Sequence, residues 1–466
     1  MNKPHEPMEK HITRETFSTS LAVFFATLGS AVGLGNIWKF PYMTGMNGGA
    51  AFILAYLFFV LLIGIPIMVS EFYLGRKTRK NAIGVFDVLK GPKFFKIIGY
   101  MGMVSALLIM FFYSTVAGWV YSYVVKALKG DFRFLKGLSI PDAKAQTTAV
   151  FNATTSGIEP MIWQGIAIIV VATILMLGVK KGIERVTKTL MPVLLILIIL
   201  IAVRAMFLPG AAEGISFLVK PDFSQLTTSS ILAAMGLAFF KLSLGMGTMV
   251  TYGSYFNKEN NLVETSFKVA FSDVVVSILA GLAIFPVVFT FGLAPEGGPG
   301  LLFNTIPLVF SLLPFGNLLL VSFFVLTGIA ATTAMVSMVE VPVAIFTEQF
   351  KINRKLSVVM ISSVMFIIGV LTTHPDALFG YIKINAMSLF DTFDYLASNV
   401  LMPVGGLLIT IFVGYFIKKN DILKELTNDG QVGNPKLIEV YRIILRYITP
   451  ILLIIVFLNA MGLFSS

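Results

Sequence analysis

The stretch GSAVGLGNIWKFP at residues 29–41 decides how the chain is interpreted. It lies inside a segment that is otherwise apolar enough to cross a bilayer. Its three glycines each weaken a helix. Backbone groups left unpaired at membrane depth are tolerated only where they line a polar cavity or are buried in protein. We therefore expect the backbone to be unwound here, and the unwound part to bind something.

The composition around this stretch is typical of an integral membrane protein. Hydrophobic residues make up 56% of the chain and charged residues only 13%. Apolar runs long enough to span a bilayer recur along the whole length, so we expect one membrane domain, 1–466, after a polar segment at 1–16. The expected spanning segments are 17–44, 49–75, 95–127, 161–180, 186–208, 228–256, 264–292, 317–349, 355–373, 390–417 and 440–463.

The distribution of basic residues predicts an orientation. The net charge of +11 could suggest a nucleic-acid partner, but the Lys and Arg residues sit in short loops between apolar runs, which excludes that class. The loops near residues 3–14, 76–96, 180–188, 351–355 and 418–424 carry most of them. By the positive-inside rule, we expect a multi-pass protein of the plasma (inner) membrane, with a cytoplasmic N-terminus and an external C-terminus.

A second interruption, FFKLSLGMG at residues 239–247, falls five segments after the first. Five is odd, so two such halves have opposite orientations in the membrane. Paired interrupted helices in corresponding places indicate an inverted repeat with its binding site between them at the midplane. We expect a first repeat at 17–208, an inverted second repeat at 228–417, and an additional helix at 440–463. The alternative is that the glycines only allow close helix packing.

These motifs resemble those of the neurotransmitter:sodium symporter family. The resemblance rests on GSAVGLGNIWKFP, the following NGGAAF, Pro66 with Glu71, SLGMG in the sixth segment and LMPVGG in the tenth. It runs from about Arg14 to the C-terminus. It implies an all-α LeuT-type fold with discontinuous helices 1 and 6 and an eleventh helix. It also implies secondary active transport of amino acids or related amines.

The resemblance assigns a substrate site at the two interruptions. Amides near the first interruption and the Tyr113 hydroxyl would hold the substrate carboxylate, while carbonyls of both interruptions would receive its ammonium. A pocket with Met246 suggests a medium or large apolar side chain. The implied residues are Ser30, Ala31, Leu34, Gly35, Ile109, Tyr113, Phe240, Lys241, Ser243, Met246 and Met338.

Two charged pairs match the gates of the family. Lys39 and Asp394 correspond to the external pair, and Arg14 and Glu348 to the internal pair. Arginine is usual where this chain has Lys39. A lysine offers one point contact instead of a planar fork, so the external gate is expected to be looser. A solvated surface pair remains the alternative for Arg14 and Glu348.

The first ion site departs from the family pattern. The positions that bind one sodium there correspond to Ala31, Asn36, Lys241 and Asp273, and the last two replace a hydroxyl and an amide. An ionisable residue at membrane depth needs a partner. The hypothesis is that Lys241 takes the place of this sodium and pairs with Asp273. The alternative is that Lys241 turns toward Tyr56 and Ser277, where chloride binds in many relatives.

The second sodium site is also incomplete. The carbonyls of Gly29 and Val32 are available, and Ala330 with Thr333 fits the eighth segment when counted back from Glu340. The next hydroxyl position is then Ala334, which leaves one ligand fewer. A slip of one residue would instead use Thr332 with Thr333.

The sequence therefore predicts a symporter that imports neutral, hydrophobic or aromatic L-amino acids. Sodium would be coupled mainly through the second site, without any other cofactor. Coupling to protons through Lys241 and Asp273, or to no cation, is the alternative, and an ion channel is a distant one. No catalytic motif points to an enzyme. The expected partners are the amino acid, sodium, the lipid bilayer and, at most, a second copy of the chain, since both monomer and homodimer remain open.

Overall fold

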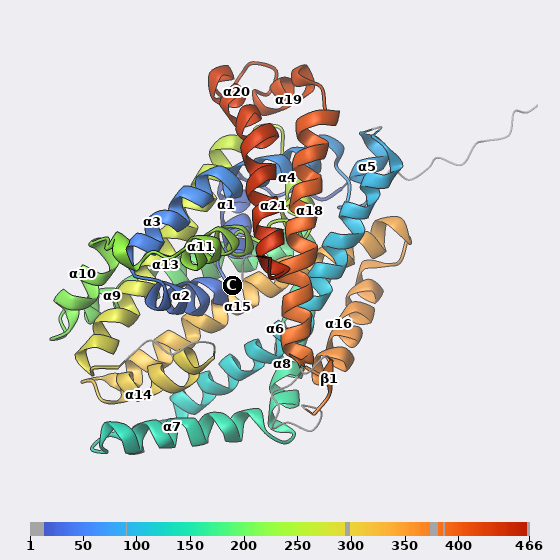
Figure 1. Cartoon of the computed structure of the whole chain (residues 1–466). Helices are drawn as coiled ribbons and strands as arrows, with labels where there is room; N and C mark the ends of the chain where they lie inside the picture. Colours follow the sequence, from blue (N-terminus) through green and yellow to red (C-terminus); the bar gives the residue numbers. More distant parts are fainter. Residues whose placement is uncertain (1–13, 90, 294–298, 373–380, 385–386, 464–466) are drawn as a thin grey trace, which may run out of the picture.

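The computed structural model describes residues 14–89, 91–293, 299–372, 381–384 and 387–463. It is almost entirely helical, apart from the short antiparallel strands β1 (Lys383–Ile384) and β2 (Met387–Ser388). Figure 1 shows α7 lying across one end of the molecule and α19 and α20 at the opposite end. The long helices run between these ends, as expected for a helical membrane domain.

The first five expected segments are all present. They comprise α1 (Ser20–Ala31), η1 (Gly35–Lys39) and α2 (Phe40–Met46); α3 (Ala50–Phe59), η2 (Val60–Gly64) and α4 (Ile65–Thr78); η3 (Lys93–Phe95) and α6 (Lys96–Lys129); α8 (Glu159–Met176); and η5 (Val179–Glu184) with α9 (Arg185–Ala205).

The other six segments follow in the same order. They comprise α11 (Thr228–Lys241) and α12 (Thr248–Gly253); α13 (Leu262–Thr290); α15 (Gly316–Gln349); α16 (Arg354–Val370); α17 (Leu389–Asp394), η8 (Tyr395–Leu401), α18 (Met402–Ile411) and η9 (Phe412–Phe416); and α20 (Pro435–Ile443), η10 (Ile444–Ile448) and α21 (Thr449–Ala460).

Both predicted interruptions are real breaks. The α1 helix and the η1–α2 helix form one span bent by 55°, and α11 is separated from α12 by six non-helical residues, 242–247. In the described part of the chain, eight helices are long and apolar enough to cross a membrane, and the bent pair makes nine. The two remaining expected segments are α11 with α12 and the 17-residue α16.

Several helices outside the spans were not expected from the sequence. All of them lie in the connections between the expected spanning segments. They are α5 (Val85–Val88), η4 (Arg133–Leu135), α7 (Ile140–Thr155), α10 (Ala211–Val219), η6 (Phe223–Gln225), η7 (Leu301–Thr305), α14 (Ile306–Ser311) and α19 (Lys419–Leu426).

Local capping helps to fix where the broken helices start. The Thr19 hydroxyl accepts a hydrogen bond from Ala22 N at the start of α1, and the Thr227 hydroxyl accepts one from Ser230 N at the start of α11. The long helix α15 lies at the centre of the fold and packs against α1, α6, α8, α9 and α16. It therefore brings its middle residues to the break in the first span.

Candidate functional site

The break in the first helix is held open by two side chains. Gly33 N donates to Asn36 Oδ1 at 3.1 Å, and Leu34 N donates to the Tyr113 hydroxyl of α6 at 3.1 Å. These amides are released from the helical ladder and would otherwise lack partners at this depth. Both amides are therefore paired within the protein, one of them with Tyr113, the residue that was expected to hold the substrate carboxylate.

The break in the sixth helix is tied to the first one. The Ser243 hydroxyl donates to the carbonyl oxygen of Ser30 at 2.9 Å. Gly245 has a positive φ of 76°, and a Cβ there would clash with the carbonyl oxygen of Met402. Its amide donates to Glu71 Oε1 at 2.7 Å. The buried carboxylate of Glu71 thus stabilises the unwound backbone.

A cavity of about 290 Å³ lies beside the first break and reaches Phe240 near the end of α11. It brings together four of the predicted substrate residues with both residues of the expected external gate. From the substrate set it includes Leu34, Gly35, Tyr113 and Phe240, and from the gate Lys39 and Asp394.

The remaining predicted substrate residues do not line this cavity. These seven residues, Ser30, Ala31, Ile109, Lys241, Ser243, Met246 and Met338, are all buried in the surrounding structure. The Ser30 hydroxyl has no hydrogen-bond partner among the described residues. The structure therefore joins the predicted set at the breaks but leaves its lower part closely packed.

Lys241 ends α11 and reaches a fully buried cluster. Its Nζ lies 3.0 Å from Asp273 Oδ2 of α13 and donates to the Tyr56 hydroxyl at 3.0 Å. It also donates to the hydroxyl of Ser277. Both charged side chains have no exposed surface. The ammonium thus contacts the partner named in the hypothesis and both residues named in the alternative, since these lie in one cluster.

Asn36 connects this cluster to the first break. Its Nδ2 donates to Asp273 Oδ1 at 2.6 Å and to Ser277 Oγ at 3.0 Å. A Cβ on Gly35 would lie 3.6 Å from Lys241 Cγ, so the lysine stem passes directly beside the unwound backbone. The structure therefore brings together three of the four residues predicted for the first ion site. Asn36 and Lys241 each contact both Asp273 and Ser277. Ala31 is the last residue of α1, directly before the first break.

The second predicted ion site lies where α15 faces α1. A Cβ on Gly29 would be 3.2 Å from Thr333 Cβ, and one on Gly33 would be 3.1 Å from Ala334 Cβ. Thr332 points elsewhere, because its hydroxyl bonds the Tyr121 hydroxyl at 2.6 Å. In this geometry Thr333 lies next to the first helix and Thr332 contacts α6, while the ligands of the second site stay a prediction.

The external pair is not formed in this structure. Lys39 Nζ lies 4.0 Å from the centroid of the Phe240 ring, and Asp394 Oδ1 accepts a hydrogen bond from Ser398 Oγ at 2.7 Å. Both residues line the same cavity, but each contacts a different side chain. The two side chains therefore form no ion pair with each other in the described structure, and the external gate stays a prediction.

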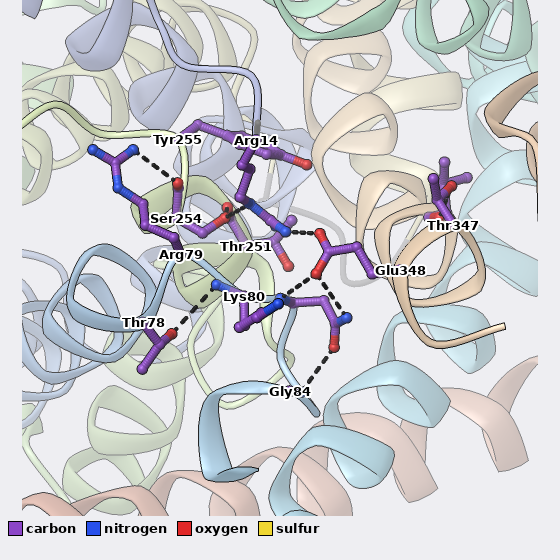
Figure 2. A network of polar contacts seen from close by, with 12 residues as sticks. Arg14, Thr78, Arg79, Lys80, Gly84, Thr251, Ser254, Tyr255, Thr347 and Glu348 are labelled. Carbon is purple, nitrogen blue, oxygen red and sulfur yellow. Dashed lines mark hydrogen bonds and ion pairs between the residues drawn. The ribbon is translucent and has the colours of Figure 1, made fainter. Parts of the chain in front are cut away.

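The internal pair is formed. Figure 2 shows Arg14 in an ion pair with Glu348, while Arg14 Nε donates to Ser254 Oγ at 2.7 Å. Glu348 Oε2 also accepts hydrogen bonds from the backbone and side-chain nitrogens of Asn81 at 3.0 and 2.9 Å. Burial lowers the pKa of Arg14, and the nearby Tyr255 opposes this shift. The two residues of the expected internal gate are therefore in contact in this structure.

Sequence reasoning missed the partner of Glu340. This buried carboxylate accepts hydrogen bonds from Nη1 and Nη2 of Arg354 at 2.9 and 2.6 Å. It also accepts one from the Tyr255 hydroxyl at 2.6 Å. Arg354 was counted only as a basic loop residue. The fork of a guanidinium bound to both carboxylate oxygens explains how Glu340 is tolerated at full burial.

Comparisons with known proteins agree with this geometry. A protein named as an uncharacterised sodium-dependent transporter of Bacillus subtilis is 38% identical over 96% of this chain and 98% of its own length. Another of the same description from Haemophilus influenzae is 36% identical, with the same coverage. The crystal structure of MhsT in complex with L-phenylalanine matches with a TM-score of 0.87 and 39% identity, over 96% of this chain and all of that chain.

The MhsT match confirms the LeuT-type fold that the motifs implied. The pattern of the sodium:neurotransmitter symporter family matches residues 14–138 and 151–466. The matched residues thus include both breaks, the Lys241 cluster and the residues predicted for the second ion site. The chain belongs to the sodium:neurotransmitter symporter family.

Proposed function

We propose that this protein imports neutral, hydrophobic or aromatic L-amino acids by sodium-coupled alternating access. The observation that carries the proposal is the pair of linked helix breaks, with a cavity beside them that is lined by Lys39 and Asp394 and with a separate ion pair between Arg14 and Glu348. This arrangement is expected of a transporter whose binding site is accessible from one side of the membrane. The L-phenylalanine complex of MhsT supports this substrate class.

Each part of a zwitterionic amino acid finds a suitable group here. Leu34 N and the Tyr113 hydroxyl face the cavity and suit the carboxylate. Phe240 provides an apolar wall and lies under Lys39. When the substrate binds, we expect Lys39 to leave the Phe240 ring and approach Asp394, which would close the external side.

The proposed coupling ion is one sodium at the second site. Its ligands would be the carbonyls of Gly29, Val32 and Ala330 with the Thr333 hydroxyl. A single hydroxyl at this site is expected to give weak sodium binding. At the first site, the ammonium of Lys241, held by Asp273, would take the place of the ion.

Proton coupling is the second candidate. It is favoured by one observation, the fully buried Lys241–Asp273 pair, since buried ionisable pairs can exchange a proton when their surroundings change. A proton taken up by Asp273 would leave the lysine charge free to face the substrate carboxylate.

Uptake into proteoliposomes separates these functions. Radiolabelled L-phenylalanine, L-leucine and L-alanine would be offered with an inward sodium gradient, an inward proton gradient or no gradient. We expect accumulation of the first two above equilibrium with sodium only. Accumulation driven by the proton gradient without sodium would replace the proposal by its alternative. Equilibration without accumulation under any gradient would refute symport altogether.

A further inference from the structure

The largest cavity described is not at the transport path. It has a volume of about 750 Å³ and lies between α8 and α9, on a floor made by α6 and α15. Its walls are apolar, with Val170 and Ile174 on the α8 side and Val186 and Leu190 on the α9 side. The transport function uses none of these residues, so this groove needs a separate explanation.

One end of the groove is basic. Lys181 and Arg185 line it there, at a spacing of four residues that places both side chains on one side of the helical turn. Both side chains are exposed, and neither forms an ion pair with another described residue, in contrast to Lys188, which pairs with Glu184. This end belongs to a side rich in Lys and Arg, which the positive-inside rule makes cytoplasmic.

A second cavity continues from this basic end. It has a volume of about 530 Å³ and shares Leu177 and Lys181 with the groove. Arg14, Glu15 and Lys180 also line it. The Glu15 carboxylate accepts Val179 N at 2.7 Å, and Arg14 Nη2 is buried without a hydrogen-bond partner among the described residues. A polar chamber with excess positive charge thus adjoins an apolar channel.

The dimensions of the groove suit an acyl chain. From Trp163 at one end to Leu177 at the other, α8 rises by roughly 21 Å at 1.5 Å per residue. We propose that the groove binds an anionic phospholipid of the cytoplasmic leaflet, with an acyl chain between α8 and α9 and its phosphate at Lys181 and Arg185. Basic pockets between transmembrane helices on that side bind such head groups by charge attraction.

The position of this lipid links it to the transport machinery. Thr332 and Gly328 of α15 form part of the floor, and the next residue, Thr333, faces Gly29 on the other side of the same helix. The basic chamber includes Arg14 of the internal pair. A bound anionic lipid is therefore placed to stabilise the closed internal side.

Binding can be measured by native mass spectrometry on the delipidated full chain. Phosphatidylglycerol and phosphatidylcholine with identical acyl chains would be compared, and inorganic phosphate would be added as a competitor. We expect a preference for phosphatidylglycerol that free phosphate does not remove. The variant Lys181→Gln/Arg185→Gln should reduce this preference roughly 30-fold, at about 1 kcal/mol per basic residue.

Three further variants separate the effect of charge from that of shape. Lys351→Gln/Lys355→Gln removes the same charge from exposed positions outside the groove and should keep the preference. Gly328→Leu should reduce binding of both lipids by filling the channel, since a Cβ at Gly328 meets Tyr121 only at 3.7 Å and is accommodated. Lys181→Arg/Arg185→Lys should retain the wild-type preference.

Three results would overturn the proposal. They are equal binding of the two lipids by the wild-type chain, an unchanged preference in Lys181→Gln/Arg185→Gln, and displacement of the lipid by phosphate alone. None of them bears on amino-acid uptake, so the lipid site and the transport function are tested independently.

Discussion

Replacing Lys241 by threonine is the sharpest perturbation of the ion sites. The change removes an ammonium that contacts Asp273, Tyr56 and Ser277 and supplies the hydroxyl that is usual at this position. Asp273 then keeps its hydrogen bonds from Asn36 and Tyr56 but loses its only described cationic partner. Removing one partner of a buried ion pair costs about 3–5 kcal/mol, because the other charge stays buried.

Sodium can take the place that the ammonium leaves. The Asp273 carboxylate, the Asn36 side chain and the new hydroxyl provide oxygen ligands of the kind that hard cations prefer. We therefore expect Lys241→Thr to be much less stable than the wild type in choline buffer and to regain stability in sodium. The sodium dependence of uptake should steepen, with a Hill slope rising from about 1 toward 2 as a second ion becomes coupled.

The assay combines thermal unfolding in detergent with uptake into proteoliposomes over a range of sodium concentrations. Lys241→Thr/Asp273→Asn should be more stable than Lys241→Thr in choline, since it leaves no unpaired charge, and should still gain sodium dependence. Lys39→Thr removes a lysine that has no carboxylate partner in the described structure, and its sodium slope should stay as in the wild type. Unchanged sodium dependence in both Lys241 variants would refute the idea that this lysine replaces an ion.

Three other predictions concern the second site, the internal gate and chloride. Ala334→Ser adds a hydroxyl opposite Gly33 and should lower the sodium concentration for half-maximal uptake about tenfold, roughly 1.4 kcal/mol; an unchanged value would exclude Ala334 from the site. Glu348→Gln weakens the pair with Arg14 and should speed labelling of a single cysteine at the buried Thr251, in a chain that has no other cysteine; equal labelling rates would contradict a gating role. Replacing chloride by gluconate should leave uptake unchanged, because Lys241 and Asp273 occupy the space between Tyr56 and Ser277; a loss of more than half of the uptake would contradict this.

The helix breaks could be predicted because their chemistry is local. Gly33, Gly35, Gly245 and Gly247 weaken helices wherever they lie, and their five-segment separation indicated the repeat. The extra helices α7 and α14 could not be predicted in the same way, since they are stabilised by tertiary packing on each other and on the long helices.

Side-chain directions were harder to predict than backbone breaks. Lys241 has four rotatable bonds, and the sequence could not show that Asp273, Tyr56 and Ser277 all lie within its reach. The separation of Lys39 from Asp394 depends on which side of the path is open, and residue types alone carry no information on that state. The pairing of Glu340 with Arg354 required knowledge of how α16 folds back on α15.

The covalent attachment of the Lys241 ammonium has a thermodynamic consequence under the proposed coupling. A cation that never leaves the protein cannot release electrochemical energy, so only the mobile sodium drives accumulation of a neutral amino acid. One sodium moving down a tenfold gradient and 100 mV supplies about 3.7 kcal/mol, which supports a concentration ratio of roughly 500. A relative with two mobile sodium ions could reach roughly the square of that ratio. Under this coupling, Lys241 lowers the concentration ratio that the transporter can reach. In return, each amino acid is transported with one sodium ion instead of two.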